Sequence, residues 1–131
     1  MQSTSGTFFA PQLIIPSGLF NLDFYLEAFG AIELGRWSND DGTIHVAELG
    51  IDGAIFHVHE ERPLKGSKTP ESVQGVTTII GLFVPDVDAV VDRAILAGAV
   101  LLSPPQDYEY HYRQAEIRDP FGHQWLIEKK I

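Results

Sequence analysis

The sequence has no cysteine in its 131 residues. This absence excludes disulfide bonds, thiolate nucleophiles and cysteine-ligated zinc or iron–sulfur sites, and it fits a reducing compartment. Basic residues are also few: 9 Lys and Arg stand against 18 Asp and Glu, which gives a formal net charge of -9 at pH 7. Because a surface of that charge repels phosphate groups, we expect no nucleic-acid partner and no attachment to membranes.

Long apolar runs are missing as well. No segment reaches the ~20 consecutive apolar residues that a membrane-spanning helix needs. Residues 1–20 lack the basic and apolar segments of a signal peptide, and Pro11 and Pro16 interrupt their only apolar run. Hydrophobic residues nevertheless make up 44% of the chain, which is enough to form a folded core. The sequence therefore predicts a single cytoplasmic domain over residues 1–131.

The hydrophobic pattern repeats one order of strands and helices in the two halves of the chain. The first half is predicted to hold a strand over 11–15, a helix over 19–29 and strands over 32–37, 43–51 and 54–59. The second half is predicted to hold a strand over 76–84, a helix over 86–97 and strands over 100–102, 110–118 and 123–129. Gly30 and Gly98 suit the ends of the two helices.

This repeat predicts an α+β fold of two βαβββ modules. Module one covers about residues 10–62, a connector about 63–75 and module two about 76–130. Since neither module can bury both faces of its own sheet, we expect two cupped mixed sheets around a cavity, with the helices on the outside.

The Asp52-Gly53 pair predicts a two-residue hairpin turn, which fixes the pairing of the strands around it. Counting outward from this turn sets Glu48 opposite His57 and brings His59 to the same face. Glu48 and His57 then have the form of a general-base dyad, in which the carboxylate orients the imidazole. The alternative is that these are polar residues on a partly solvated strand, with a merely structural pair.

Aromatic residues are dense over residues 108–112. Strand alternation places Tyr110 and Tyr112 on one side and Arg113 on the other. With Trp125 the tyrosines can wall a cavity for a flat or apolar ligand, as aromatic side chains do in many small-molecule sites. A dimer interface or the edge of the core is the alternative interpretation.

The last predicted turn, Asp119 to Gly122, lies just before His123. Asp119 has a structural reason to be there, because it can accept bonds from amides of its own turn. We therefore interpret Asp119 and His123 as structural residues. Counting outward from this turn sets Arg113 near Glu128, either as a salt bridge or with Arg113 presented to an anionic ligand.

Three segments carry a resemblance to a known family: DFY at residues 23–25, VPDVDAV at 84–90 and RDPFGH at 118–123. With them, almost the whole sequence resembles the vicinal oxygen chelate superfamily, and within it the glyoxalase and bleomycin-resistance-like proteins. The resemblance implies paired βαβββ modules and a homodimer. It does not single out an activity, because the superfamily holds metal lyases, transferases, dioxygenases and drug-binding proteins.

The resemblance also implies where metal ligands would lie. In the metal-binding members each module supplies one ligand from its fourth strand and one from its first. The fourth-strand positions correspond to His57 and Leu126. The first-strand positions correspond to Gln12, or Ala10, and to Ile79 or its neighbours Thr77 and Gly81. Leu126 and Ile79 cannot bind a metal, so a four-ligand site of the family type is not expected.

The sequence leaves three alternative functions. The first is a binding protein for a small organic molecule, without an established cofactor. The second is a metal-dependent lyase, isomerase or dioxygenase-like enzyme, in which Gln12, Glu48, His57 and His59 hold zinc, nickel, iron or manganese. The third is an interaction module whose cavity is filled by side chains. The candidate ligand-binding residues are Gln12, His59, Tyr110, Tyr112, Arg113 and Trp125, and the candidate catalytic residues are Glu48 and His57.

Overall fold

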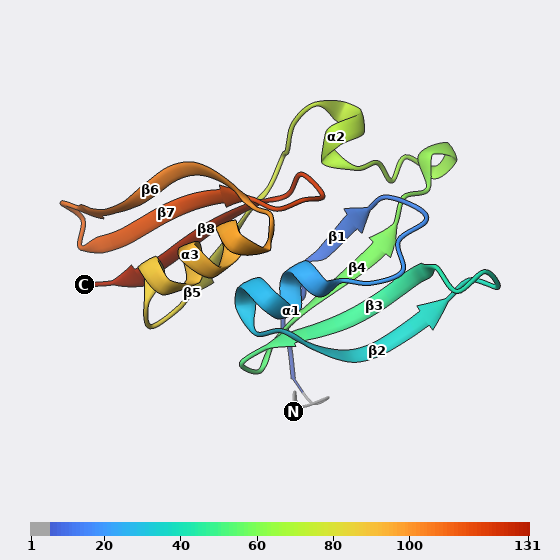
Figure 1. Cartoon of the computed structure of the whole chain (residues 1–131), viewed down its shortest axis with the longest axis horizontal. Helices are drawn as coiled ribbons and strands as arrows, with labels where there is room; N and C mark the ends of the chain where they lie inside the picture. The colour runs from blue at the N-terminus through green and yellow to red at the C-terminus, as the bar shows by residue number, and fades with distance from the viewer. Residues whose placement is uncertain (1–5) are drawn as a thin grey trace.

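The computed structural model describes residues 6–131 and shows two four-stranded sheets, each with one main helix (Figure 1). The first module contains β1 (Gln12–Ile15), α1 (Asp23–Phe29), β2 (Ile32–Ser38), β3 (Ile44–Ile51) and β4 (Ala54–Glu60). Its strands lie in the order β1-β4-β3-β2. β1 runs parallel to β4, and the other neighbours are antiparallel.

The second module repeats this topology. It contains β5 (Ile79–Phe83), α3 (Val87–Ala97), β6 (Val100–Tyr108), β7 (Tyr112–Arg118) and β8 (Gln124–Lys130), in the order β5-β8-β7-β6. The connector holds two short helices, η1 (Pro63–Lys65) and α2 (Pro70–Val73). The predicted α+β fold of two βαβββ modules is confirmed. No helix among residues 6–131 is long and apolar enough to cross a membrane.

The β6–β7 hairpin differs from the expected strands. β6 continues past Pro104 and Pro105 to Tyr108, with register shifts on both sides of Ser103. Prolines are tolerated there because β6 is an edge strand, where a missing N–H need not break the ladder. The chain then turns before β7, and His111 takes a left-handed φ of 67° in that turn.

Each sheet turns one face toward its helix, and these two helix-covered faces form one common core. Phe56 on β4 and Trp125 on β8 occupy equivalent places, three residues beyond Gly53 and Gly122. Their rings meet with centroids 5.6 Å apart. α1 and α3 pack side by side over this seam (Figure 1).

We call the opposite side of each sheet its open face. Successive side chains of a strand point to opposite faces, so the side chains on either side of Phe56 and Trp125 point away from the core. Because Phe56 and Trp125 point toward each other, the two open faces of one chain point away from each other. This arrangement decides which predicted site residues can meet.

Candidate functional site

The open face of module one carries the predicted Glu48–His57 pair. β3 and β4 set the two residues opposite each other, so the register predicted from the Asp52-Gly53 turn is confirmed. His57 Nε2 lies 3.2 Å from Glu48 Oε2, with the two side chains 34% and 33% exposed. Gln12 on β1 is aligned with His57 on the same sheet. The geometry allows proton exchange between the pair and a molecule lying on this face.

His59 is placed differently from its predicted neighbours. Its side chain is buried, its Nδ1 lies 2.6 Å from the carbonyl oxygen of Glu60, and its ring packs edge-on against His45. The carboxylate of Glu60 bonds His45, and this bond lowers the pKa of Glu60 below its usual value. His59 is therefore engaged in a local contact near the strand end.

Among the predicted metal donors, Glu48 and His57 contact each other with Gln12 alongside, whereas His59 contacts the carbonyl oxygen of Glu60. Among residues 6–131 no three His, Cys, Asp or Glu side chains lie close enough together to hold an ion. The equivalent place in module two is aliphatic, because Leu126 lies opposite Glu116 where His57 lies opposite Glu48. The side chains present therefore do not fit a divalent metal of the family type.

Trp37 is a site residue that the sequence analysis missed. It lies on β2, and a Cβ added at Gly35 would sit 3.2 Å from its ring. Gly35 is paired with Glu48, so the indole lies beside the Glu48–His57 pair on the open face of module one. The indole is 57% exposed, which leaves it available to a ligand. The glycine two residues before it in the strand was the only signal in the sequence.

The open face of module two carries a continuous row of rings, which we call the aromatic strip: Phe83, Tyr108, Tyr110 and Tyr112. Tyr108 and Tyr110 are stacked with centroids 5.4 Å apart, and Tyr110 lies 5.8 Å from Tyr112. Tyr112 in turn meets Phe83 of β5 at 6.0 Å. Tyr110 and Tyr112 lie together as predicted, although Tyr110 sits in the turn after β6, and Tyr108 lies with them. Phe83 was missed, because its place depends on the pairing of β5 with β8.

Glu128 lies on the same face and is 6% exposed. Its Oε1 accepts a 2.8 Å bond from Gln114 Nε2, and the Tyr110 hydroxyl donates to Gln114 Oε1. Desolvation of the phenol, with Tyr108 and Glu128 nearby, raises the pKa of Tyr110. Glu128 makes no ion pair within residues 6–131.

Arg113 is not beside Glu128, so that prediction was wrong. β7 and β8 pair Gln114 with Glu128, one residue away from the expected register. Arg113 instead points to the helix-covered side, where it bonds Asp88 at 2.8 and 2.9 Å and Asp107 at 2.9 Å. Its guanidinium lowers the pKa of Asp88. Arg113 is thus occupied by two carboxylates rather than presented to an anionic ligand.

Trp125 also departs from its predicted place beside the tyrosines. It is 1% exposed and packs in the common core, with its ring 4.7 Å from that of Phe29. Its Nε1 donates a 2.9 Å bond to Asp119 Oδ2, which also accepts a 2.6 Å bond from the Tyr25 hydroxyl. Trp125 and its neighbour Leu126 point to opposite faces of β8, so the burial of Trp125 in the core leaves Leu126 on the open face.

The Asp119 carboxylate has a structural role, as its position in the turn predicts. Besides Tyr25 and Trp125, its oxygens accept bonds from the amides of Phe121 and His123. His123 Nε2 lies 2.7 Å from the carbonyl oxygen of Ile14, which ties this turn to β1 of the other module. These contacts hold the seam between the modules.

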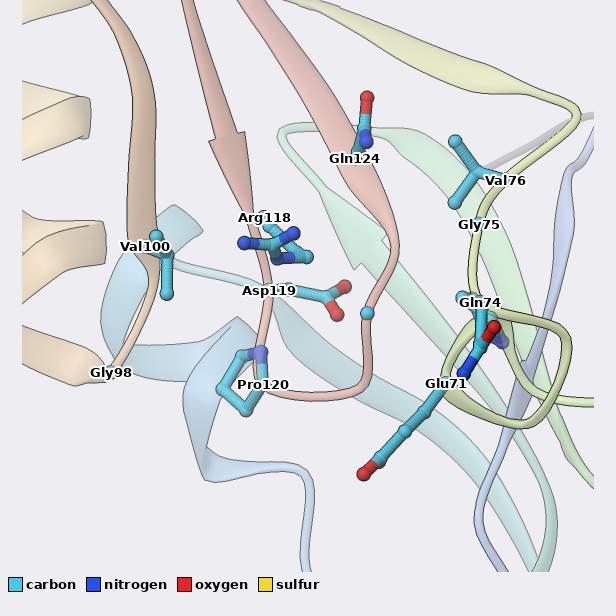
Figure 2. A pocket seen from close by; sticks show the side chains of 12 residues that line it. Glu71, Gln74, Gly75, Val76, Gly98, Val100, Arg118, Asp119, Pro120 and Gln124 are labelled. Atoms are coloured by element: carbon cyan, nitrogen blue, oxygen red, sulfur yellow. The ribbon is translucent and has the colours of Figure 1, made fainter.

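A cavity of about 760 Å³ lies at the turn end of the open face of module two. α2, the β7–β8 turn and the connection from α3 to β6 surround it, and Figure 2 shows Arg118 and Gln124 among its walls. In the same view the Glu71 carboxylate points away from Arg118. Within residues 6–131 the Arg118 guanidinium has no ion pair with a carboxylate. The cavity unites segments distant in sequence, so local patterns gave no signal for it.

The family model of the Glyoxalase/Bleomycin resistance protein/Dioxygenase superfamily matches residues 21–127. The chain belongs to this superfamily. This match confirms the resemblance to the glyoxalase and bleomycin-resistance-like proteins that the sequence motifs indicated.

Relatives in this superfamily align over most of the chain. The uncharacterized protein Rv0887c of Mycobacterium tuberculosis is 36% identical over 125 residues, which cover 93% of this chain and 74% of that protein. The uncharacterized protein At5g48480 of Arabidopsis thaliana is 34% identical over 116 residues, covering 82% and 68%. The crystal structure of TioX from Micromonospora sp. ML1 superposes with a TM-score of 0.70 at 28% identity, over 96% of this chain and 100% of TioX.

Proposed function

We propose that this protein binds a small organic molecule on the open faces of its sheets. The observation that carries the proposal is the aromatic strip on module two, on a face where the superfamily's metal positions hold Ile79 and Leu126. Exposed aromatic rings give a large contact area for a flat ligand, and a metal-dependent reaction needs donors that these two positions lack. Trp37 supplies a comparable surface on module one.

We infer further that the binding form is a homodimer in the cytoplasm. The two open faces of one chain point apart, so a closed cavity requires the open face of a second copy. Several apolar side chains on these faces are about half exposed, with Trp37 at 57%, Phe83 at 55% and Ile79 at 49%. Exposed apolar clusters of this kind mark interaction surfaces.

Two substitutions that introduce a negative charge test the dimer. Phe83→Glu should convert the dimer to a monomer in analytical ultracentrifugation, whereas Leu96→Glu should leave it intact. Leu96 is the matched control because it is 89% exposed on α3, away from the open faces. A wild-type protein that sediments as a monomer would contradict this part of the proposal.

A neutral flat probe tests the binding function. Quinoline titrations of the wild type, Trp37→Ala, Tyr112→Ala and the control Leu96→Ala can be followed by isothermal calorimetry. We expect Tyr112→Ala to weaken binding at least fivefold, because each aromatic contact contributes about 0.5–1.5 kcal/mol beyond area burial. Equal affinity in all four proteins would refute binding at the open faces.

The Glu48–His57 pair supports a second candidate, an enzyme with a rearranged metal site. Its 3.2 Å contact has the geometry of a general-base dyad, and Gln12 lies alongside. Elemental analysis of the purified protein, with chelation and metal add-back, separates the two candidates. A stoichiometric metal that His57→Ala removes would support the enzyme. Metal-free protein with unchanged thermal stability would support the binding protein.

A further inference from the structure

We propose that the aromatic strip and Glu128 together form a recognition site for an organic cation. The inference rests on the proposed function and adds the charge of the ligand: an ammonium, guanidinium or quaternised ring nitrogen. Its basis is the Glu128 carboxylate, which makes no ion pair in the described part of the chain and lies on the same face as the aromatic strip.

The carboxylate of Glu128 is nearly buried, and none of the cationic groups within residues 6–131 forms an ion pair with it. A desolvated carboxylate is costly unless a cation or several donors compensate it. Here Gln114 supplies one neutral donor, at 2.8 Å from Oε1. Arg113 and Lys129 lie on the covered face, where Arg113 bonds two aspartates and the Lys129 ammonium lies 3.4 Å from the carbonyl oxygen of Pro85. Lys130 lies on the open face two residues along β8, and within residues 6–131 it makes no ion pair with Glu128. A bound organic cation would supply the missing charge.

The rings around this carboxylate suit the same ligand. The face of an aromatic ring carries partial negative charge and attracts a cation placed over it. Tyr108 and Tyr110 are stacked within 12° of parallel, and Tyr112 and Phe83 meet at 66°. Rings at such different angles present faces in more than one direction, as a cation-binding box requires. Tyr110 and Phe83 are 54% and 55% exposed, so these faces are accessible.

Gly81 leaves the space that the Glu128 carboxylate occupies. A Cβ added at Gly81 would lie 2.6 Å from Glu128 Oε2, so the carboxylate occupies the volume that a side chain would fill. Gly81 is on β5, opposite Leu126 and two residues before Phe83. The glycine therefore allows the negative charge to lie against the sheet, beneath the rings.

Three probes with one ring system and different charges test the proposal: N-methylquinolinium, neutral quinoline and quinoline-4-carboxylate. Calorimetric titrations at pH 7.5 and low salt measure their dissociation constants for the wild type, Glu128→Gln, Gly81→Ala and Asp92→Asn. Asp92→Asn is the matched control, since it removes one negative charge from an exposed position on α3.

We expect the wild type to bind N-methylquinolinium at least tenfold more tightly than quinoline, with the carboxylate weakest. In Glu128→Gln the dissociation constants of N-methylquinolinium and quinoline should lie within about twofold of each other, and that of quinoline should not change. The reason is that glutamine keeps the shape of the side chain and loses its charge. Gly81→Ala should lower the preference by displacing the carboxylate, and Asp92→Asn should keep it.

The outcomes separate the two proposals. Equal binding of all three probes, or a preference that survives Glu128→Gln, overturns the cation site and leaves the binding function standing. A preference for the carboxylate also overturns it, and points to Arg118 instead. Failure of all three probes to bind overturns both proposals. Circular dichroism and thermal melts of each variant confirm that the protein tested is folded.

Discussion

The two modules share one topology but differ at equivalent positions of their open faces. In module one, His57 faces Glu48 across the hairpin, and in module two Leu126 faces Glu116. The carboxylate is kept in both and the imidazole in only one. The second module has instead a row of four rings over Glu128. The two copies of one scaffold thus differ in the chemistry of their open faces, with an imidazole–carboxylate pair on one and a row of rings on the other.

The covered faces differ much less. Phe56 and Trp125 occupy equivalent places, both are buried, and they meet at the seam. Packing constrains these positions because both modules must close one core, whereas the open faces are free to diverge. The comparison predicts that stability depends on the covered faces and ligand choice on the open ones.

Trp125→Ala should have the largest effect on stability. Removing a fully buried indole from the seam is expected to lower the free energy of unfolding by about 3–5 kcal/mol, through lost apolar contact and the cavity left behind. Urea denaturation followed by circular dichroism measures it, with Leu96→Ala as the exposed control. A loss below about 1 kcal/mol would mean that the seam does not hold the modules together.

Tyr25→Phe should have an intermediate effect. The Tyr25 hydroxyl donates a 2.6 Å bond to the buried Asp119 carboxylate, and its removal should cost about 1–3 kcal/mol. Burial, with the charge of Asp119 nearby, raises the pKa of Tyr25 well above its usual 10. The folded state therefore holds this proton more tightly than the unfolded state does.

This shift gives a pH dependence with a definite sign. The contribution of Tyr25 is fully present below pH 10 and is lost as the pH rises above 10 toward the folded-state pKa. The difference in unfolding free energy between wild type and Tyr25→Phe should accordingly shrink between pH 8 and pH 10.5. A constant difference would show that Tyr25 ionises equally easily in both states.

The smallest effects are expected on the open faces, where two Glu→Gln variants should behave differently. Glu48→Gln should cost less than about 1 kcal/mol, because its pair with His57 is one-third exposed and screened by solvent. Glu128→Gln should leave the unfolding free energy equal or higher, since it removes a desolvated charge and keeps the bond to Gln114. A clear loss for Glu128→Gln would make Glu128 a structural residue.

Local turn chemistry explains how much of this molecule was predictable. Asp52-Gly53 takes φ values of 49° and 89°, a two-residue turn, so counting from it gave the Glu48–His57 contact correctly. The β7–β8 turn is longer, with Arg118 opposite Gln124, and counting from it misplaced Arg113 by one residue. The order of elements along the chain followed from the repeat, because both modules show the same βαβββ pattern.

What the sequence did not determine was which face of each sheet the helix covers. Alternation separates Trp125 from Leu126 but does not say which of them is buried, so Trp125 was assigned to the ligand wall. For the same reason Phe83 and the importance of Glu128 were not predicted. Their surroundings come from β5, β7 and β8 together. The cavity at Arg118 depends on the connector packing beside a distant turn, which no local pattern records.

The most direct test of binding at the aromatic strip is a titration of ¹⁵N-labelled wild-type protein with N-methylquinolinium, followed by amide chemical shifts. We expect the largest shifts on the open face of module two, at the amides of Gly81, Tyr112, Gln114 and Glu128. The amides of Trp37 and His57 would also shift if the open face of a second copy closes the cavity. Shifts confined to Arg118, Gln124 and Gln74, or no shifts at saturating probe, would contradict the claim that the aromatic strip is the binding surface.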